Sequence, residues 1–171
     1  MACCDLRSFW KLKSDFIEGI IEREGGAKIV VDTGGTTKYG ISEKGTGLSP
    51  EEIKALTKRK AIEIYRTHYY EPSKCNRLPE HLQECFFDSV VNQGRSRATK
   101  ILQEASNNKN GKGKYIAVDG RIGRNTLKAV QNLEMERFQA FRIKHYASLA
   151  EKRPDKYEKY YYGWYRRALS V

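Results

Sequence analysis

The sequence predicts a mainly α-helical protein with one small β-hairpin near its N-terminus. Helix start signals and helical spacing of apolar residues recur along most of the chain, whereas short β-branched runs occur together only in residues 28–42. The length of 171 residues allows one compact domain with a core, or one domain and a small appendage. Hydrophobic residues make up 39% and charged residues 31%, which is typical of a globular protein.

The first predicted helix, FIEGIIERE, ends at the pair Gly25–Gly26, because glycine tolerates the left-handed backbone that closes a helix. Ser14 or Asp15 can cap its N-terminus, and Asp15 with Glu18 has the spacing of a capping box. The runs KIVVD and TTKYGIS then predict two strands joined by the three residues TGG.

The rest of the chain is predicted to be helical. In LSPEE, Ser49 caps a helix, Pro50 occupies its first position and Glu52 completes a capping box, with a break expected near Thr57. Further helices are predicted at residues 79–92, 95–105 and 125–152. The polar, glycine-punctuated stretch SNNKNGKGK predicts a boundary between a region 1–105 and a region 115–171.

Charge and composition narrow the function classes. The net charge of +11 attracts polyanions, either nucleic acid or a bacterial cell wall, although a merely solvated basic surface is the alternative. No stretch approaches the roughly 20 apolar residues needed to cross a bilayer, and the N-terminus lacks the apolar segment of a signal peptide. The cysteines favour a reduced, cytosolic protein. Neither they nor the histidines have metal-type spacing, so no metal site or cofactor is predicted.

Glu24 is the acid that the helical pattern singles out. At about 100° per residue, Glu24 falls on the apolar face of the first helix, whereas Glu18 and Glu22 point the opposite way. Burial and the partial negative charge at a helix C-terminus both disfavour an ionised carboxyl group. We therefore expect Glu24 to stay protonated near neutral pH, as a general acid must.

Asp32 is expected to differ from Glu24, because free N–H groups and water at the hairpin turn keep a carboxylate ionised. Glycoside hydrolysis uses such a pair: one acid protonates the leaving oxygen, and the other activates water or stabilises positive charge. Spacing alone leaves simpler interpretations open. Glu24 can turn to solvent or bind a basic partner, and Asp32 can be an ordinary turn residue.

Several motifs, in order, resemble glycoside hydrolase family 108. Glu24-Gly25-Gly26 followed by DTGGTTKYGIS resembles the family signature "EGG…DpGGpTnyGIs". The resemblance continues through AIEIYRTHYYEP, CFFDSVVNQG, ATKILQEA, VDGRIGRNTLKAV and YYGWYRR, and so covers nearly all of residues 14–167. Members are lysozyme-like N-acetylmuramidases of phages and prophages, and some are described as secretion activators.

This resemblance implies a small α-rich, lysozyme-like fold that hydrolyses the β-1,4 bond between N-acetylmuramic acid and N-acetylglucosamine in peptidoglycan. Residues 1–105 would form the catalytic region, and residues 115–171 a peptidoglycan-binding helical region packed on the same globule. Glu24 carries over as the general acid, with Asp32 as the second acid and Thr37 positioning the hydrolytic water. The segment AKIVV is one residue shorter than the family pattern and lacks the usual tyrosine, a departure that bears on the reach of Asp32.

Four further residues are predicted to bind substrate: Gly35, Tyr39, Asp88 and Asn92. Asp88 and Asn92 lie four positions apart on one helix face, so both can point inward. They form either a cleft floor that touches the glycan or orients the front loop, or a buried pair that satisfies backbone groups. Trp164 and its tyrosine neighbours either stack on sugar rings or pin the C-terminal tail to the core.

The predicted partner is the glycan strand of peptidoglycan, with no nucleic acid and no membrane insertion expected. The alternative is a catalytically inactive lysozyme-like protein that binds the cell wall or is associated with secretion. Nucleic-acid binding rests on charge alone, since no recognition-helix motif is present. Made in the bacterial cytoplasm, the chain is expected to act on the wall after holin-type or other export.

Overall fold

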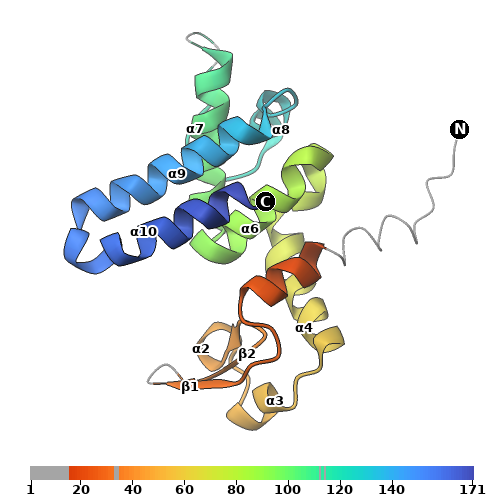
Figure 1. Ribbon diagram of the computed structural model, residues 1–171. Coiled ribbons are helices and arrows are strands. Elements are labelled where there is room, and N and C mark those ends of the chain that lie inside the picture. Colours follow the sequence, from red (N-terminus) through yellow and green to blue (C-terminus); the bar gives the residue numbers. More distant parts are fainter. Residues whose placement is uncertain (1–15, 33–34, 112, 114) are drawn as a thin grey trace, which may run out of the picture. The chain divides into compact units, whose positions relative to one another are not determined.

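The computed structural model describes residues 16–32, 35–111, 113 and 115–171, and it confirms a mainly helical fold with one small antiparallel sheet (Figure 1). The predicted cap residues Ser14 and Asp15 lie outside the described residues. The chain divides into two compact units, unit 1 (residues 1–68) and unit 2 (residues 69–171), so the compact units divide at a different place from the predicted boundary. No helix in the described ranges is long and apolar enough to cross a membrane.

The described part of unit 1 starts in a helix that includes residues 16–23 and ends, as predicted, at a pair of glycines. The N–H of Gly25 donates to the carbonyl of Glu22 (3.1 Å), and the N–H of Gly26 donates to the carbonyl of Ile21 (3.0 Å). Both glycines have positive φ, +104° and +56°. These two bonds form a Schellman motif, which satisfies carbonyl groups that the helix end leaves free.

Three short strands follow and form one sheet in the order β1 (Val30–Asp32), β2 (Gly35–Lys38) and β3 (Ile41–Ser42). Asp32 pairs with Gly35, so only residues 33–34 join β1 to β2. The predicted loop TGG is therefore one residue too long, because Gly35 already belongs to the ladder.

The run TTKYGIS is two strands and not one. Lys38 pairs with Ile41, and the two residues between them, Tyr39 and Gly40, have φ values of 55° and 72°. A two-residue hairpin turn of type I′ requires positive φ at both central positions. Gly40 adopts this conformation without strain, whereas for Tyr39 it is uncommon and must be held by the surrounding structure.

The remaining helices of unit 1 are α2 (Glu43–Thr46), α3 (Pro50–Lys54) and α4 (Lys58–Ile64). The capping box of α3 is confirmed: Ser49 Oγ accepts from the N–H of Glu52 (3.3 Å), whose carboxylate accepts from the N–H of Ser49 (2.8 Å). Thr57 caps α4, so the predicted break at this residue is also confirmed. A π-helix, η1 (Tyr65–Tyr70), follows directly, and the boundary between the units falls within it.

Unit 2 contains α5 (Glu71–Ser73), the 3-10 turn η2 (Cys75–Arg77), α6 (Glu80–Gln93), α7 (Arg95–Asn110), α8 (Arg124–Ala129), α9 (Met135–Lys152) and α10 (Pro154–Leu169). Helices α9 and α10 lie side by side, and α9 also packs on α6 and α7 (Figure 1). The core of unit 2 combines aliphatic and aromatic side chains, and it includes Phe86, Phe87, Leu102, Phe138 and Tyr146.

Two predicted helices have different bounds in the structure. Helix α7 continues to Asn110, so the first residues of SNNKNGKGK are helical. The long helix predicted at residues 125–152 is broken into α8 and α9. Val130 and Leu133 lie in the break, are 0% and 1% exposed, and are joined by a turn in which Leu133 N–H donates to Val130 carbonyl (3.1 Å). This bond joins residues three positions apart and not the four of an α-helix, so the chain leaves the α-helical path at this turn.

Candidate active site

Glu24 lies where the first helix ends, directly before the glycine pair. Its N–H donates to the carbonyl of Ile20 (2.9 Å), so its backbone still belongs to the last helical turn. The residue is half-buried, and its Oε1 atom is buried. The helix end thus places one carboxyl oxygen away from bulk water, which agrees with the position of Glu24 on the predicted apolar face.

The turn between β2 and β3 packs directly on the side chain of Glu24. A Cβ atom added to Gly40 would lie 2.6 Å from Cβ of Glu24 and 2.5 Å from Oη of Tyr65. Contacts this short are forbidden, so only glycine fits at position 40. The stem of Glu24 is therefore confined by backbone on one side.

This turn is itself fastened at two points. The N–H of Tyr39 donates to the carbonyl of Gly26 (2.9 Å), which ties the turn to the end of the first helix. The hydroxyl of Tyr65, a residue only 2% exposed, donates to the carbonyl of Tyr39 (3.1 Å). Tyr39 keeps its positive φ because both of its backbone polar groups are held in this way.

The other predicted catalytic residues lie on the sheet. Thr37 is half-buried on β2, where it pairs with Val30 and Ser42. Asp32 is exposed at the end of β1. Asp32 pairs with Gly35, the first residue of β2, whereas the turn that contacts Glu24 follows Lys38, the last residue of β2. About three strand steps of roughly 3.3 Å therefore separate the Asp32 end of β2 from the Glu24 end. Thr37 lies between them along the strand.

Glu43 is an acid that the sequence analysis did not single out. Its Oε1 accepts the N–H of Thr36 at 2.5 Å. Strand β3 ends at Ser42, so this carboxylate takes the place that a further residue of β3 would have beside Thr36. A Cβ atom on Gly35 would lie 2.9 Å from the carboxyl carbon of Glu43. A side chain at position 35 would therefore displace this carboxylate, and the φ of +104° at Gly35 is one that other residues rarely adopt. An acid in the first turn of a helix, directly after the YGIS motif, was the available signal.

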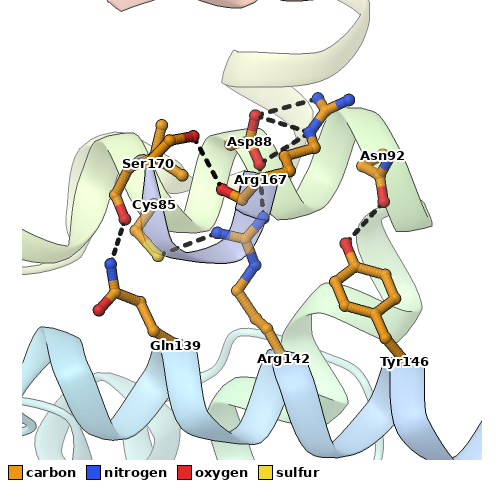
Figure 2. A network of polar contacts seen from close by, with 9 residues as sticks. Cys85, Asp88, Asn92, Gln139, Arg142, Tyr146, Arg167 and Ser170 are labelled. Carbon is orange, nitrogen blue, oxygen red and sulfur yellow. Dashed lines mark hydrogen bonds and ion pairs between the residues drawn. The ribbon is translucent and has the colours of Figure 1, made fainter. Parts of the chain in front are cut away.

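Asp88, on α6 of unit 2, is completely buried and has no surface to offer a ligand (Figure 2). Its Oδ2 binds Nη2 of Arg142 at 2.5 Å, and its Oδ1 binds Nη2 of Arg167 at 3.0 Å. Because both oxygens bind guanidinium groups, Asp88 fastens α6 to α9 and α10. The predicted contact of Asp88 with substrate is replaced by this internal role.

Arg142 also reaches the sulfur of Cys85, since its Nη1 lies 3.2 Å from Sγ (Figure 2). Burial raises the pKa of the Cys85 thiol, although the Arg142 charge acts in the opposite direction. The sulfur that faces Arg142 is therefore a neutral thiol, and Asp88 supplies the negative charge.

Asn92, four residues after Asp88 on α6, is exposed. Its Oδ1 accepts the hydroxyl of Tyr146 at 2.7 Å, and the Tyr146 ring stacks on Trp164 with centroids 5.1 Å apart (Figure 2 shows the hydrogen bond). Tyr157 and Tyr160 also contact the Trp164 ring. Trp164 thus joins α10 to α9, while the contact of Asn92 with substrate stays a prediction.

A hollow of about 620 Å³ in unit 1 lies over α3 and α4, but none of Glu24, Asp32 and Thr37 lines it. In the described ranges no group of His, Cys, Asp and Glu side chains is placed to hold a metal ion. The candidate site consists of Glu24, the Tyr39–Gly40 turn that confines it, and strand β2, whose first residue pairs with Asp32.

A mainly helical fold with a small sheet, in which an acid at a helix end packs against that sheet, is of the lysozyme-like class. Residues 17–94 match the family model described as Glycosyl hydrolase 108, and residues 97–169 match the model described as Predicted Peptidoglycan domain. The chain thus carries a glycosyl hydrolase 108 region, followed by a predicted peptidoglycan domain.

Among solved structures, the structure of Brucella abortus SagA is similar to this chain. The two share 27% sequence identity with a TM-score of 0.66, over 92% of this chain and 95% of that chain. No curated protein matches the chain. The two matched regions share unit 2, because α6 belongs to the hydrolase region whereas α7, α8, α9 and α10 belong to the peptidoglycan domain.

Proposed function

We propose that this protein hydrolyses peptidoglycan by cutting the β-1,4 bond between N-acetylmuramic acid and N-acetylglucosamine. The observation that carries this proposal is the position of Glu24, in a region of the glycosyl hydrolase 108 family. One of its oxygens is buried, and the Tyr39–Gly40 turn confines its stem. A general acid needs both a fixed position and restricted access to water.

In the proposed reaction, Glu24 gives its proton to the glycosidic oxygen as the bond from that oxygen to the anomeric carbon breaks. The bonding electron pair leaves with the oxygen, and positive charge develops on the sugar. Asp32 then stabilises this charge or takes a proton from the water that adds to the anomeric carbon. Thr37 lies between the two ends of β2 and would orient that water.

The remaining parts of the chain support binding of the same substrate. The net charge of +11 favours encounter with an anionic wall polymer. The predicted peptidoglycan domain over residues 97–169 supports the choice of polymer. Tyr39, beside Glu24, and Asn92, exposed on α6, are the proposed contacts to the glycan. Gly35 contributes by allowing Glu43 to fasten β2.

The test is a zymogram on purified peptidoglycan that compares the wild type with Glu24→Gln, followed by product masses to identify the bond. The amide keeps the shape of the side chain but cannot donate the proton with the same strength, so lysis is expected to vanish. Glu22→Gln is the matched control, because Glu22 lies exposed on the same helix and pairs with Lys58 (3.3 Å). Full lysis by a folded Glu24→Gln protein would refute the assignment.

The second candidate is a wall-binding protein without activity. The separate domain match over residues 97–169 favours it, since such a region can bind the wall whether or not the other cleaves it. In that case the wild type is retained on peptidoglycan, but no reducing ends are released.

A further inference from the structure

Unit 2 contains a hollow of about 490 Å³, and none of the residues of the proposed reaction lines it. Pockets for small ligands commonly have volumes in this range. We call it the amide pocket, and it is lined by Asn110, Ile116, Asn125, Lys128, Ala129 and Asn132. All of these residues lie within the predicted peptidoglycan domain.

Side-chain amides build the walls of the amide pocket. Asn107 on α7 binds both backbone groups of Ile116, donating to its carbonyl (2.9 Å) and accepting its N–H (2.8 Å). Asn110 donates to the carbonyl of Ala129 at 3.3 Å, and Ser106 donates to the same carbonyl at 3.1 Å. Three segments of the chain are thereby fixed around the hollow before any ligand arrives.

The lining combines a small apolar part with polar groups that are available to a ligand. Ile116 and Ala129 are half-buried, whereas Asn125, Lys128 and Asn132 are exposed. Within the described ranges, none of these three exposed side chains makes a hydrogen bond or ion pair with another residue. The neighbouring acid Glu134 is already occupied, since it pairs with Lys109 and with Arg137.

These groups fit one chemical class. An ammonium group binds a carboxylate, and a primary amide both donates to and accepts from a peptide group. Half-buried Ile116 and Ala129 suit a methyl group. We propose that the amide pocket binds an N-acylated group that bears a carboxylate, with Lys128 on the carboxylate and the asparagines on the amide. In peptidoglycan this chemistry occurs in the D-alanyl end of the stem peptide and in N-acetylmuramic acid.

This inference rests on peptidoglycan being the polymer that the protein recognises, but it is tested without hydrolysis. The probes are N-acetyl-D-alanyl-D-alanine and N-acetylmuramic acid, neither of which contains a glycosidic bond that the proposed reaction cuts. Each is titrated into the full-length, ¹⁵N-labelled protein, and amide shifts are followed. Shifts are expected at the pocket residues. Lys128→Ala should raise the dissociation constant at least about tenfold.

Three comparisons make the result decisive. Asn132→Ala should weaken binding as well, whereas Lys54→Ala, which removes an exposed lysine of unit 1, should leave it unchanged. Replacing the carboxylate of the dipeptide by an amide should have the same effect as Lys128→Ala. If only N-acetylmuramic acid binds, the proposal is supported and the carboxylate that the pocket recognises is that of the sugar.

The proposal is overturned if neither probe binds, or if Lys128→Ala and Asn132→Ala both bind like the wild type. It fails separately from the proposed hydrolysis. Glu24→Gln is expected to lose lysis and still bind both probes. If the wild type lyses peptidoglycan but binds neither probe, the pocket proposal is refuted while the proposed hydrolysis stands.

Discussion

Asp88 and Arg142 form an ion pair in which neither side chain has any exposed surface. The pair joins α6 to α9, and Arg167, whose side chain is only 16% exposed, adds α10 through the second carboxylate oxygen. Taking charges out of water is costly, and the cost is recovered only while every charge keeps its partner. Removing the acid would leave two guanidinium groups in the interior facing no carboxylate.

Asp88→Asn is therefore expected to lower the free energy of unfolding by about 3–5 kcal/mol. Urea unfolding of the full-length protein, followed by circular dichroism, measures this loss. Asp155→Asn serves as the control, because Asp155 is exposed in the first turn of α10, and it should change the stability by less than about 1 kcal/mol. An Asp88→Asn protein as stable as that control would contradict the anchoring role.

Gly40→Ala should remove lytic activity, because the added methyl group would meet Cβ of Glu24 at 2.6 Å. Gly47 offers a matched control: its φ of +74° is close to the +72° of Gly40, but nothing lies within 4 Å of its added Cβ. Both alanine variants pay for left-handed backbone, of the order of 1 kcal/mol. Turbidity clearing per folded molecule, with folding checked by circular dichroism, should fall for Gly40→Ala alone. Equal activity in the two would mean that the close approach does not position Glu24.

Tyr65→Phe removes the hydroxyl that holds the carbonyl of Tyr39, a hydrogen bond worth about 0.5–1.5 kcal/mol of stability. If the turn positions Glu24, kcat should fall by about tenfold while KM changes little. Tyr70→Phe loses a comparable bond, to Oε1 of Gln83 (3.2 Å), and should cost similar stability with unchanged kcat. A Tyr65→Phe protein that loses stability but keeps its kcat would show that the bond is only structural.

Glu134 predicts a pH effect on stability. Arg137, followed by Lys109, lowers the pKa of Glu134 from 4.5 to about 2. Because the pKa is depressed in the folded state, this stabilisation is present above about pH 4.5 and is lost as the pH falls through about 2. Glu134→Gln should unfold at a lower temperature than the wild type at pH 7, and the two melting temperatures should converge near pH 2. A difference that is independent of pH would exclude the ion pairs as its cause.

The elements that the sequence predicted correctly are those fixed by neighbouring residues. The Schellman end at Gly25–Gly26 and the capping box of Ser49 and Glu52 each close within a few positions, so their bonds can be anticipated from spacing. The break between α8 and α9 was not predicted, because its residues, VQNLE (130–134), include no glycine or proline that would signal a helix end.

The candidate site shows the same division. Glu24 could be placed on the apolar face from helical periodicity alone, and the structure buries one of its oxygens. Asp88 was expected on an inward face, but its partners Arg142 and Arg167 lie 54 and 79 positions away in the chain. Sequence spacing shows which side chains share a helix face, but it does not show which charged residues of other helices pack against that face.

The Asp88 anchor also bears on how such proteins can be built from parts. The carboxylate belongs to the hydrolase region, and both arginines belong to the peptidoglycan domain, although all three lie in one compact unit. A gene fusion that exchanged the second region for another would strand a bare negative charge in a hydrophobic interior. A replacement for the second region is therefore expected to fold well with this hydrolase region only if it supplies cationic partners for Asp88.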